Sequence, residues 1–233
     1  MEPPGLDRQI AGLAVLGEPA RRALYLYVAD RQGDVGRDEA ARAVGVSRSL
    51  AGFHLDRLVE KGLLEASFRR LSGRSGPGAG RPAKLYRRSS RQIEVSLPQR
   101  SYELAARILV TAIEASEAPK ARNALAKTAR NIGERIGAEA RTRAGPRPGK
   151  KSLLAAMVAA LAARGYEPEA AAGEVELRNC PFHALAGEHE EVVCGMNLAL
   201  LEGVVEGLRL PSAKAVLDPA PGMCCVRLKL RTK

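Results

Sequence analysis

The chain has 233 residues, enough for two modest domains, and its net charge of +11 is carried by the first two thirds. Residues 151–233 hold 9 Lys and Arg against 10 Asp and Glu and are nearly neutral. This asymmetry indicates a front part that binds a polyanion and a back part with another task. The longest run of small apolar residues, 153–163, is too short to span a membrane. The segment MEPPGLDRQI does not resemble a secretory signal, so we expect a cytoplasmic protein without a membrane partner.

Residues 19–61 contain the signals of three short helices. The apolar spacing predicts a helix over about Pro19–Asp30 and another over Asp38–Val44. Gly45 is suited to a left-handed C-cap, and Ser47 to the N-cap of a third helix that runs to about Lys61. The last two helices are joined by three residues, which is the spacing of a helix-turn-helix.

A basic β-hairpin is predicted directly after these helices. Its strands are Leu63–Arg70 and Lys84–Arg88, and the loop between them reads LSGRSGPGAGRPA. From Arg69 to Arg91 there are eight basic residues and no acidic one. A helix pair followed by such a hairpin is typical of proteins that grip the phosphate backbone of DNA. We therefore predict a winged helix-turn-helix domain over residues 1–97, with a double-stranded DNA operator as partner.

The third helix has an apolar stripe that we expect to be buried, formed by Leu50, Leu55, Leu58 and Val59. Residues outside this stripe, together with basic residues of the hairpin, are the candidates for DNA contact: Ser47, Arg48, Ser49, Gly52, Phe53, His54, Arg57, Arg74, Arg81 and Lys84. Arg48 has the chemistry to pair bidentately with guanine, whereas the hairpin cations suit phosphates or a narrow minor groove. For His54, packing, a phosphate contact and a switch all remain open.

Two long helices are predicted next, over about Gln99–Glu117 and Ala121–Arg141, in a helical region that we place at residues 98–149. The first has an apolar stripe that either packs on the rest of the chain or forms a dimer interface: Leu104, Ala105, Ile108, Leu109, Ala112 and Ile113.

Residues 150–233 are predicted to form a small α+β domain. The expected elements are a helix over Lys151–Arg164, a strand or hairpin over Tyr166–Asn179, a helix over Glu190–Leu208, and strands at Lys214–Leu217 and Met223–Leu230.

This last domain holds all four cysteines and two of the three histidines: Cys180, His183, His189, Cys194, Cys224 and Cys225. Their spacing matches no zinc finger and no ferredoxin run. Because side chains alternate along a strand, we expect only one of Cys224 and Cys225 to reach a common site with Cys180 and Cys194. Three interpretations stay open, namely a metal or iron–sulfur site with zinc as the other metal, a thiol redox switch, and cysteines buried as small apolar residues.

An enzyme with a cysteine nucleophile is disfavoured. A reactive thiolate needs a base beside it, and nothing in the sequence places His183 or His189 next to a particular thiol. We therefore expect no catalytic residues.

Several segments together resemble a bacterial family over nearly all of residues 15–230: VGVSRSLAGFHLDRLVEKGLLE, GRSGPGAGRPAKLYRR, SLPQRSYELAARIL, NCPFHALAGEHEEVVCGMNLALLEG and PGMCCV. They are similar to the ArsR-type winged-helix regulators that include SufR-like iron–sulfur-sensing repressors. The resemblance implies a homodimeric repressor whose cluster is held by Cys180, Cys194 and one of Cys224 and Cys225. The two histidines and the Cys-Cys pair depart from the family pattern, so a relative that senses another metal, a small organic effector or thiol oxidation is the alternative.

Overall fold

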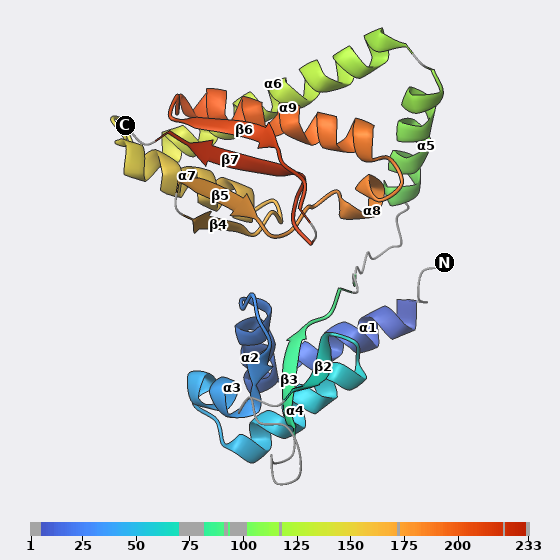
Figure 1. The fold of residues 1–233 in the computed structure, drawn as a ribbon, viewed down its shortest axis with the longest axis vertical. Helices are drawn as coiled ribbons and strands as arrows, with labels where there is room; N and C mark the ends of the chain where they lie inside the picture. Colours follow the sequence, from blue (N-terminus) through green and yellow to red (C-terminus); the bar gives the residue numbers. More distant parts are fainter. Residues whose placement is uncertain are drawn as a thin grey trace. The chain divides into compact units, whose positions relative to one another are not determined.

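The computed structural model of the chain describes residues 6–69, 82–90, 93, 102–116, 118–171, 173–220 and 222–231. They belong to two compact units, residues 1–100 and 101–233 (Figure 1). The fold is α+β with two small antiparallel sheets, as predicted. None of the helices in these ranges is long and apolar enough to cross a membrane.

The first unit begins with helices, and its predicted helices are confirmed. They are α2 (Pro19–Ala29), α3 (Arg37–Val44) and α4 (Arg48–Glu60); helix α1 (Leu6–Ala14) and a 3₁₀ turn (Val15–Gly17) precede them and were not predicted. Gly45 ends α3 with φ +75°, a left-handed conformation that costs glycine little. The Ser47 hydroxyl accepts a hydrogen bond from the Leu50 N–H at 3.2 Å and so caps α4.

The sheet of the first unit contains the predicted hairpin. Strands β2 (Leu64–Arg69) and β3 (Ala83–Arg88) pair antiparallel from Leu64 opposite Arg88 to Arg69 opposite Ala83. A two-residue strand, β1 (Val35–Gly36), pairs with the other edge of β3 and is too short to show a period in the sequence. Helices and sheet share one core, which contains Leu24, Val28, Leu55, Leu58, Leu64 and Tyr86.

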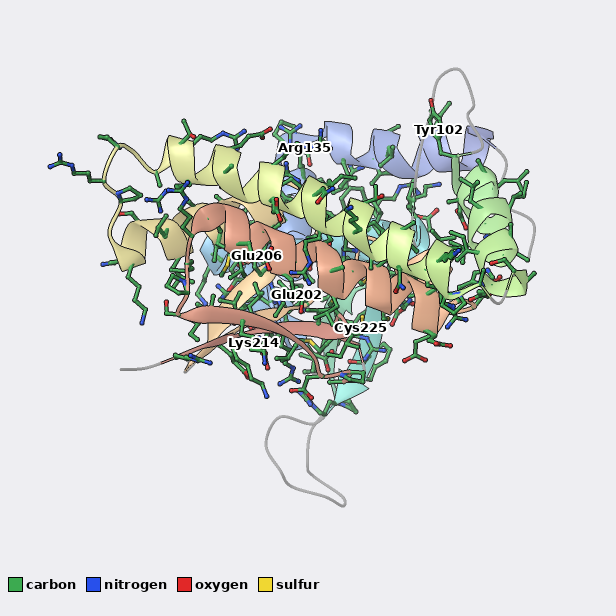
Figure 2. All side chains as sticks on the ribbon, turned by 90° about the horizontal axis from the view of Figure 1, so that it is seen from above. Tyr102, Arg135, Glu202, Glu206, Lys214 and Cys225 are labelled. Atoms are coloured by element: carbon green, nitrogen blue, oxygen red, sulfur yellow. The ribbon has the colours of Figure 1, made fainter. Side chains whose placement is uncertain are left out.

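The second unit has a four-stranded sheet in the order β4-β5-β7-β6. Its strands are β4 (Pro168–Ala171), β5 (Glu174–Leu177), β6 (Ala213–Leu217) and β7 (Val226–Leu230). Its helices are α5 (Tyr102–Ala115), α6 (Pro119–Arg143), α7 (Lys150–Ala162), α8 (His183–Ala186) and α9 (Glu190–Leu208). Seen from above in Figure 2, strand β6, helix α9 and helix α6 lie in successive layers.

Helices α6 and α9 pack backbone against backbone through four glycines. Gly133 and Gly137 lie one turn apart on α6, and Gly203 and Gly207 lie one turn apart on α9. A Cβ on Gly133 would lie 2.0 Å from the Leu200 carbonyl oxygen, and one on Gly203 would lie 2.1 Å from that of Arg130. Because Gly137 in turn meets Val204 and Leu208, the two helices run parallel.

This contact joins the expected helical region to the C-terminal domain. Residues 98–149 were predicted as a separate helical region, yet α5 and α6 belong to the same compact unit as the C-terminal domain. The reason is that the glycine face of α6 leaves no room for a layer between it and α9.

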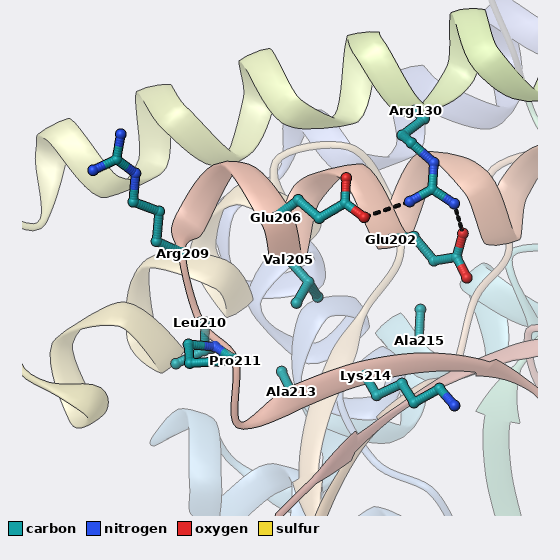
Figure 3. Close-up of a pocket in the computed structure, with 10 residues that line it drawn as sticks. All are labelled: Arg130, Glu202, Val205, Glu206, Arg209, Leu210, Pro211, Ala213, Lys214 and Ala215. Carbon is teal, nitrogen blue, oxygen red and sulfur yellow. Dashed lines mark hydrogen bonds and ion pairs between the residues drawn. The ribbon is translucent and has the colours of Figure 1, made fainter.

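Ion pairs also connect α6 and α9 on the solvent-exposed side of their contact. Arg130 of α6 reaches over α9 and forms ion pairs with both Glu202 and Glu206 (Figure 3). Below them, a pocket of about 600 Å³ lies between α9 and β6, and its lining includes Val205 of α9 and Ala213 and Ala215 of β6.

We predict that Gly203→Ala destabilises the second unit. Its new methyl group would collide with backbone atoms of Arg130 and Glu134, and forcing such overpacking costs about 1–3 kcal/mol. The matched control is Gly195→Ala on the same helix, where no atom of the described residues lies within 4 Å of the added Cβ. That variant gains up to about 1 kcal/mol from helix propensity. Urea unfolding measures both changes, and equal effects of the two substitutions would contradict the close helix contact.

Candidate functional site

The exposed face of α4 is the first candidate site. Its outward residues are Arg48, Ser49, Leu50, Phe53 and Asp56, and its buried ones are Ala51, Gly52, His54, Leu55 and Leu58. The prediction that Leu50 belongs to the buried stripe is wrong, because Leu50 is 41% exposed. The stripe is centred on Ala51, Leu55 and Leu58, so Leu50 is turned toward solvent.

Two predicted DNA contacts, His54 and Gly52, are turned inward. His54 is 5% exposed, accepts a hydrogen bond from Nε of Arg21 at Nδ1 (3.2 Å), and has Nε2 3.3 Å from a Glu18 carboxylate oxygen. Gly52 is covered by the Arg37 side chain, whose Cδ would lie 2.9 Å from an added Cβ. Both residues therefore face the rest of the unit, and His54 also ties α4 to Arg21 and Glu18. Of the interpretations left open for His54, the structure matches packing.

The cations of this surface are paired with carboxylates. Arg48 lies 2.7 Å from Asp38, and Arg57 lies 2.5 Å from Glu60. Lys84 of β3 lies 2.7 Å from Asp56 of α4. Ser49 and Phe53 are exposed between these pairs, while Ser47 uses its hydroxyl as the helix cap. The predicted contacts Arg74 and Arg81 lie outside the described residues.

Asp56 fastens α4 to β3. Besides Lys84, it accepts a hydrogen bond from the Tyr86 hydroxyl at 2.7 Å. Burial raises the pKa of the Asp56 carboxyl, but the hydrogen bonds from Lys84 and Tyr86 outweigh burial, so the pKa lies below its ordinary value. Burial and the bond to Asp56 raise the pKa of Tyr86, whose ring is buried.

The second candidate site brings all four cysteines together as free thiols. The thiols form a chain of contacts, in which Cys180 contacts Cys224, Cys224 contacts Cys225, and Cys225 contacts Cys194. Cys180 comes from the loop after β5, Cys194 from α9, and the pair from the turn before β7. Three segments distant in sequence therefore meet at one set of sulfurs.

The expectation that only one of Cys224 and Cys225 reaches this site rested on strand alternation, which the structure does not show at these two residues. It assumed a strand over Met223–Leu230, in which alternation would separate the two side chains. Strand β7 begins at Val226, so the pair lies in the preceding turn, where alternation does not apply.

Cys224 lies at the centre of the chain of thiols. It accepts hydrogen bonds from Cys180 and Cys225, and these hold the pKa of its thiol far below the ordinary value while the pKa values of the two donors rise. Asn197 Nδ2 donates to Cys224 Sγ at 3.3 Å, and the Tyr166 hydroxyl donates to Asn197 Oδ1 at 2.7 Å. Asn197 and Tyr166 are buried and were not predicted; the only signal is an amide within the otherwise apolar run of α9.

The two histidines predicted as ligands are placed elsewhere. His189 Nδ1 lies 2.6 Å from the Glu114 carboxylate of α5, and His183 is exposed on α8. Arg107 of α5 also pairs with Glu188 and donates to the Ala184 carbonyl at 3.2 Å. The segment between Cys180 and Cys194 is thereby fastened to α5.

The four cysteine sulfurs are ligands that soft metals prefer, but they are not arranged around a common metal position. Within the described ranges, no three His, Cys, Asp or Glu side chains are grouped so as to hold a metal ion. The sulfurs would therefore have to rearrange to surround an ion or a cluster. A pocket of about 400 Å³, lined by Glu190, Glu191, Cys194, Leu217 and Cys225 among others, opens onto this site.

Comparisons of the chain with protein-family models, with curated proteins and with solved structures give no match. Functional conclusions therefore rest on the α4 surface and the thiol site themselves.

We predict that Asp56→Asn weakens the attachment of α4 to β3 at neutral pH. The pKa of Asp56 is depressed in the folded state, so its stabilising contribution is present above the unfolded value of 3.8 and is lost as the pH falls through the folded pKa. For a pair this exposed we expect up to about 1 kcal/mol. Hydrogen exchange of amides in α4 and β3 measures it; the control is Glu60→Gln, whose ion pairs to Arg57 and Lys61 lie at the end of α4 and do not involve β3. A deficit of Asp56→Asn that persists below the carboxylate pKa would contradict this interpretation.

Proposed function

We propose that the chain is a DNA-binding transcriptional regulator, a homodimeric repressor with a cysteine-based sensor in its second unit. The observation that carries the proposal is the combination of an outward, capped helix α4 with the β2–β3 hairpin, whose connecting sequence contains only basic charges. In a winged helix-turn-helix, α3 and α4 would be the helix pair and the hairpin the wing. The resemblance to ArsR-type regulators supports the same interpretation.

In this proposal α4 enters the major groove and the hairpin loop follows the phosphate backbone. The pairs Arg48–Asp38 and Lys84–Asp56 exchange their carboxylates for phosphates or base edges when DNA arrives. Since such exposed pairs contribute little to stability, they hold the cations near their DNA targets at small cost.

A twofold operator requires two copies of the chain, and α5 offers a surface for pairing. Ala106, Val110 and Ile113 are half-buried, whereas Leu104, Ile108 and Leu109 are each more than half exposed. The exposed residues, together with Ala105 and Ala112, recur at helical spacing along one side of α5. We propose that this stripe is the homodimer interface.

The sensor would use the thiol site. Cys180, Cys194, Cys224 and Cys225 are soft donors, and the buried amide of Asn197 that donates to Cys224 Sγ favours the thiolate, the form in which cysteine binds metal. They would hold an iron–sulfur cluster, which supplies sensitivity to oxidants and to iron supply, or a zinc ion. Rearrangement of Cys180 and Cys194 would shift the segment between them, which is fastened to α5 through His189–Glu114 and through Arg107. The coupling thus reaches the proposed dimer helix.

One observation favours a second candidate function, regulation by a small organic effector. The pocket of about 600 Å³ between α9 and β6 has the size of small-molecule sites and a largely apolar floor (Figure 3). In that case the thiols would be structural or redox-active.

Charge reversal in the hairpin loop tests the DNA-binding proposal. We expect Arg74→Glu with Arg81→Glu to weaken binding of a fluorescent duplex and to lower its salt slope by about 0.9 for each phosphate that the loop no longer binds. Lys214→Glu with Lys229→Glu, an exposed pair of cations on the sheet of the second unit, is the matched control. Unchanged affinity and salt slope in the loop variant would reject the wing.

Anaerobic purification tests the sensor. We expect iron and sulfide, or stoichiometric zinc, in the full chain and their loss in Cys224→Ser, because Cys224 contacts two of the other thiols. His183→Ala should keep its full content, since His183 lies on the exposed side of α8. A metal-free protein that binds its operator equally well with reduced, oxidised and alkylated thiols would reject sensing at this site.

A further inference from the structure

The outward face of α4 is apolar where a DNA-reading helix commonly carries free polar groups. Phe53 is 64% exposed and Leu50 41% exposed, on the same side of the helix as Ser49. The neighbouring cations are occupied, with Arg48 held by Asp38 and Arg57 held by Glu60. The groups at the centre of this face that can contact a base without first giving up an ion pair are therefore a hydroxyl, an isobutyl group and an aromatic ring.

Phe53 is supported from behind. Its ring centroid lies 5.4 Å from that of His54, and His54 is fixed by Arg21 and Glu18. A large apolar side chain held outward on a firm base loses little freedom on binding, and it gains from removal of apolar surface from water.

The major groove presents one apolar group on its base edges, the C5-methyl of thymine, and contact with phenylalanine is one of the known ways to read it. We infer that α4 selects C5-methylated pyrimidines through Phe53, with Leu50 beside it. The inference rests on the proposed DNA-binding function and specifies what the helix recognises. Thymine and 5-methylcytosine share this chemistry, so either base can supply the methyl group.

The test starts from a pool of duplexes with a randomised centre, from which the full-length wild-type protein selects its preferred site. Each thymine of that site is then replaced by deoxyuridine, which removes only the methyl group. At one or more positions we expect affinity to fall about fourfold, the effect of losing one buried methyl-sized group. In Phe53→Ala the ratio of affinities for the two duplexes should fall to one at those positions.

The matched control is Phe68→Ala, an equally exposed aromatic residue on β2, which should keep the wild-type ratio. Thermal unfolding of Phe53→Ala should match the wild type because the ring is mostly exposed. Comparing cytosine with 5-methylcytosine at the sensitive positions identifies the source: a gain on methylation shows that the methyl group alone suffices, and no gain restricts recognition to thymine.

Failure of the inference and failure of the proposed function give different results. A protein that enriches no sequence and binds no duplex refutes DNA binding itself. A protein that enriches a site but tolerates deoxyuridine at every thymine remains a DNA-binding protein, and reading by Phe53 is then overturned.

Discussion

The close contact between α6 and α9 is the constraint on which the second unit depends. Four glycines let the two backbones touch, and a single methyl group on any of them would meet backbone atoms at 2.2 Å or less. Arg130 can therefore reach across α9 to both Glu202 and Glu206, and Arg141 can donate to the Leu208 carbonyl at the end of that helix. With α6 on its outer side, α9 presents its other side to the sheet, where Leu201, Val204 and Leu208 join the core.

The position of α9 in turn determines the thiol site. Cys194 and Asn197 lie on this helix, one turn apart, and both face the turn that carries Cys224 and Cys225. A buried amide needs a partner, and Asn197 finds two in Cys224 and Tyr166. The sulfurs are thus set in a polar network within an apolar core. This differs from cysteines that merely fill space, because Cys224 accepts a hydrogen bond from a buried amide.

In the first unit, helix α4 is packed firmly on one side and is exposed on the other. The interior of α4 is secured by Leu55 and Leu58, by His54 toward α2, and by Asp56 toward β3. These attachments leave Ser49, Leu50 and Phe53 outward. On this surface Arg48 and Arg57 are paired with carboxylates, and the exposed residues between them, Leu50 and Phe53, are apolar. The basic net charge of the chain does not predict this apolar patch.

Local signals in the sequence determined the elements, and the tertiary structure decided which of them act together. The bounds of α9, the cap at Ser47 and the left-handed Gly45 follow from periodicity and turn chemistry within a few residues. Clustering of the cysteines in the sequence also predicted that Cys180 and Cys194 share a site. The partners of charged groups, the inward turn of Gly52 and the presence of both Cys224 and Cys225 at one site depend on contacts between distant segments. Such contacts produce no periodic pattern in the sequence. They form only when segments that are distant in the sequence pack against one another at specific separations.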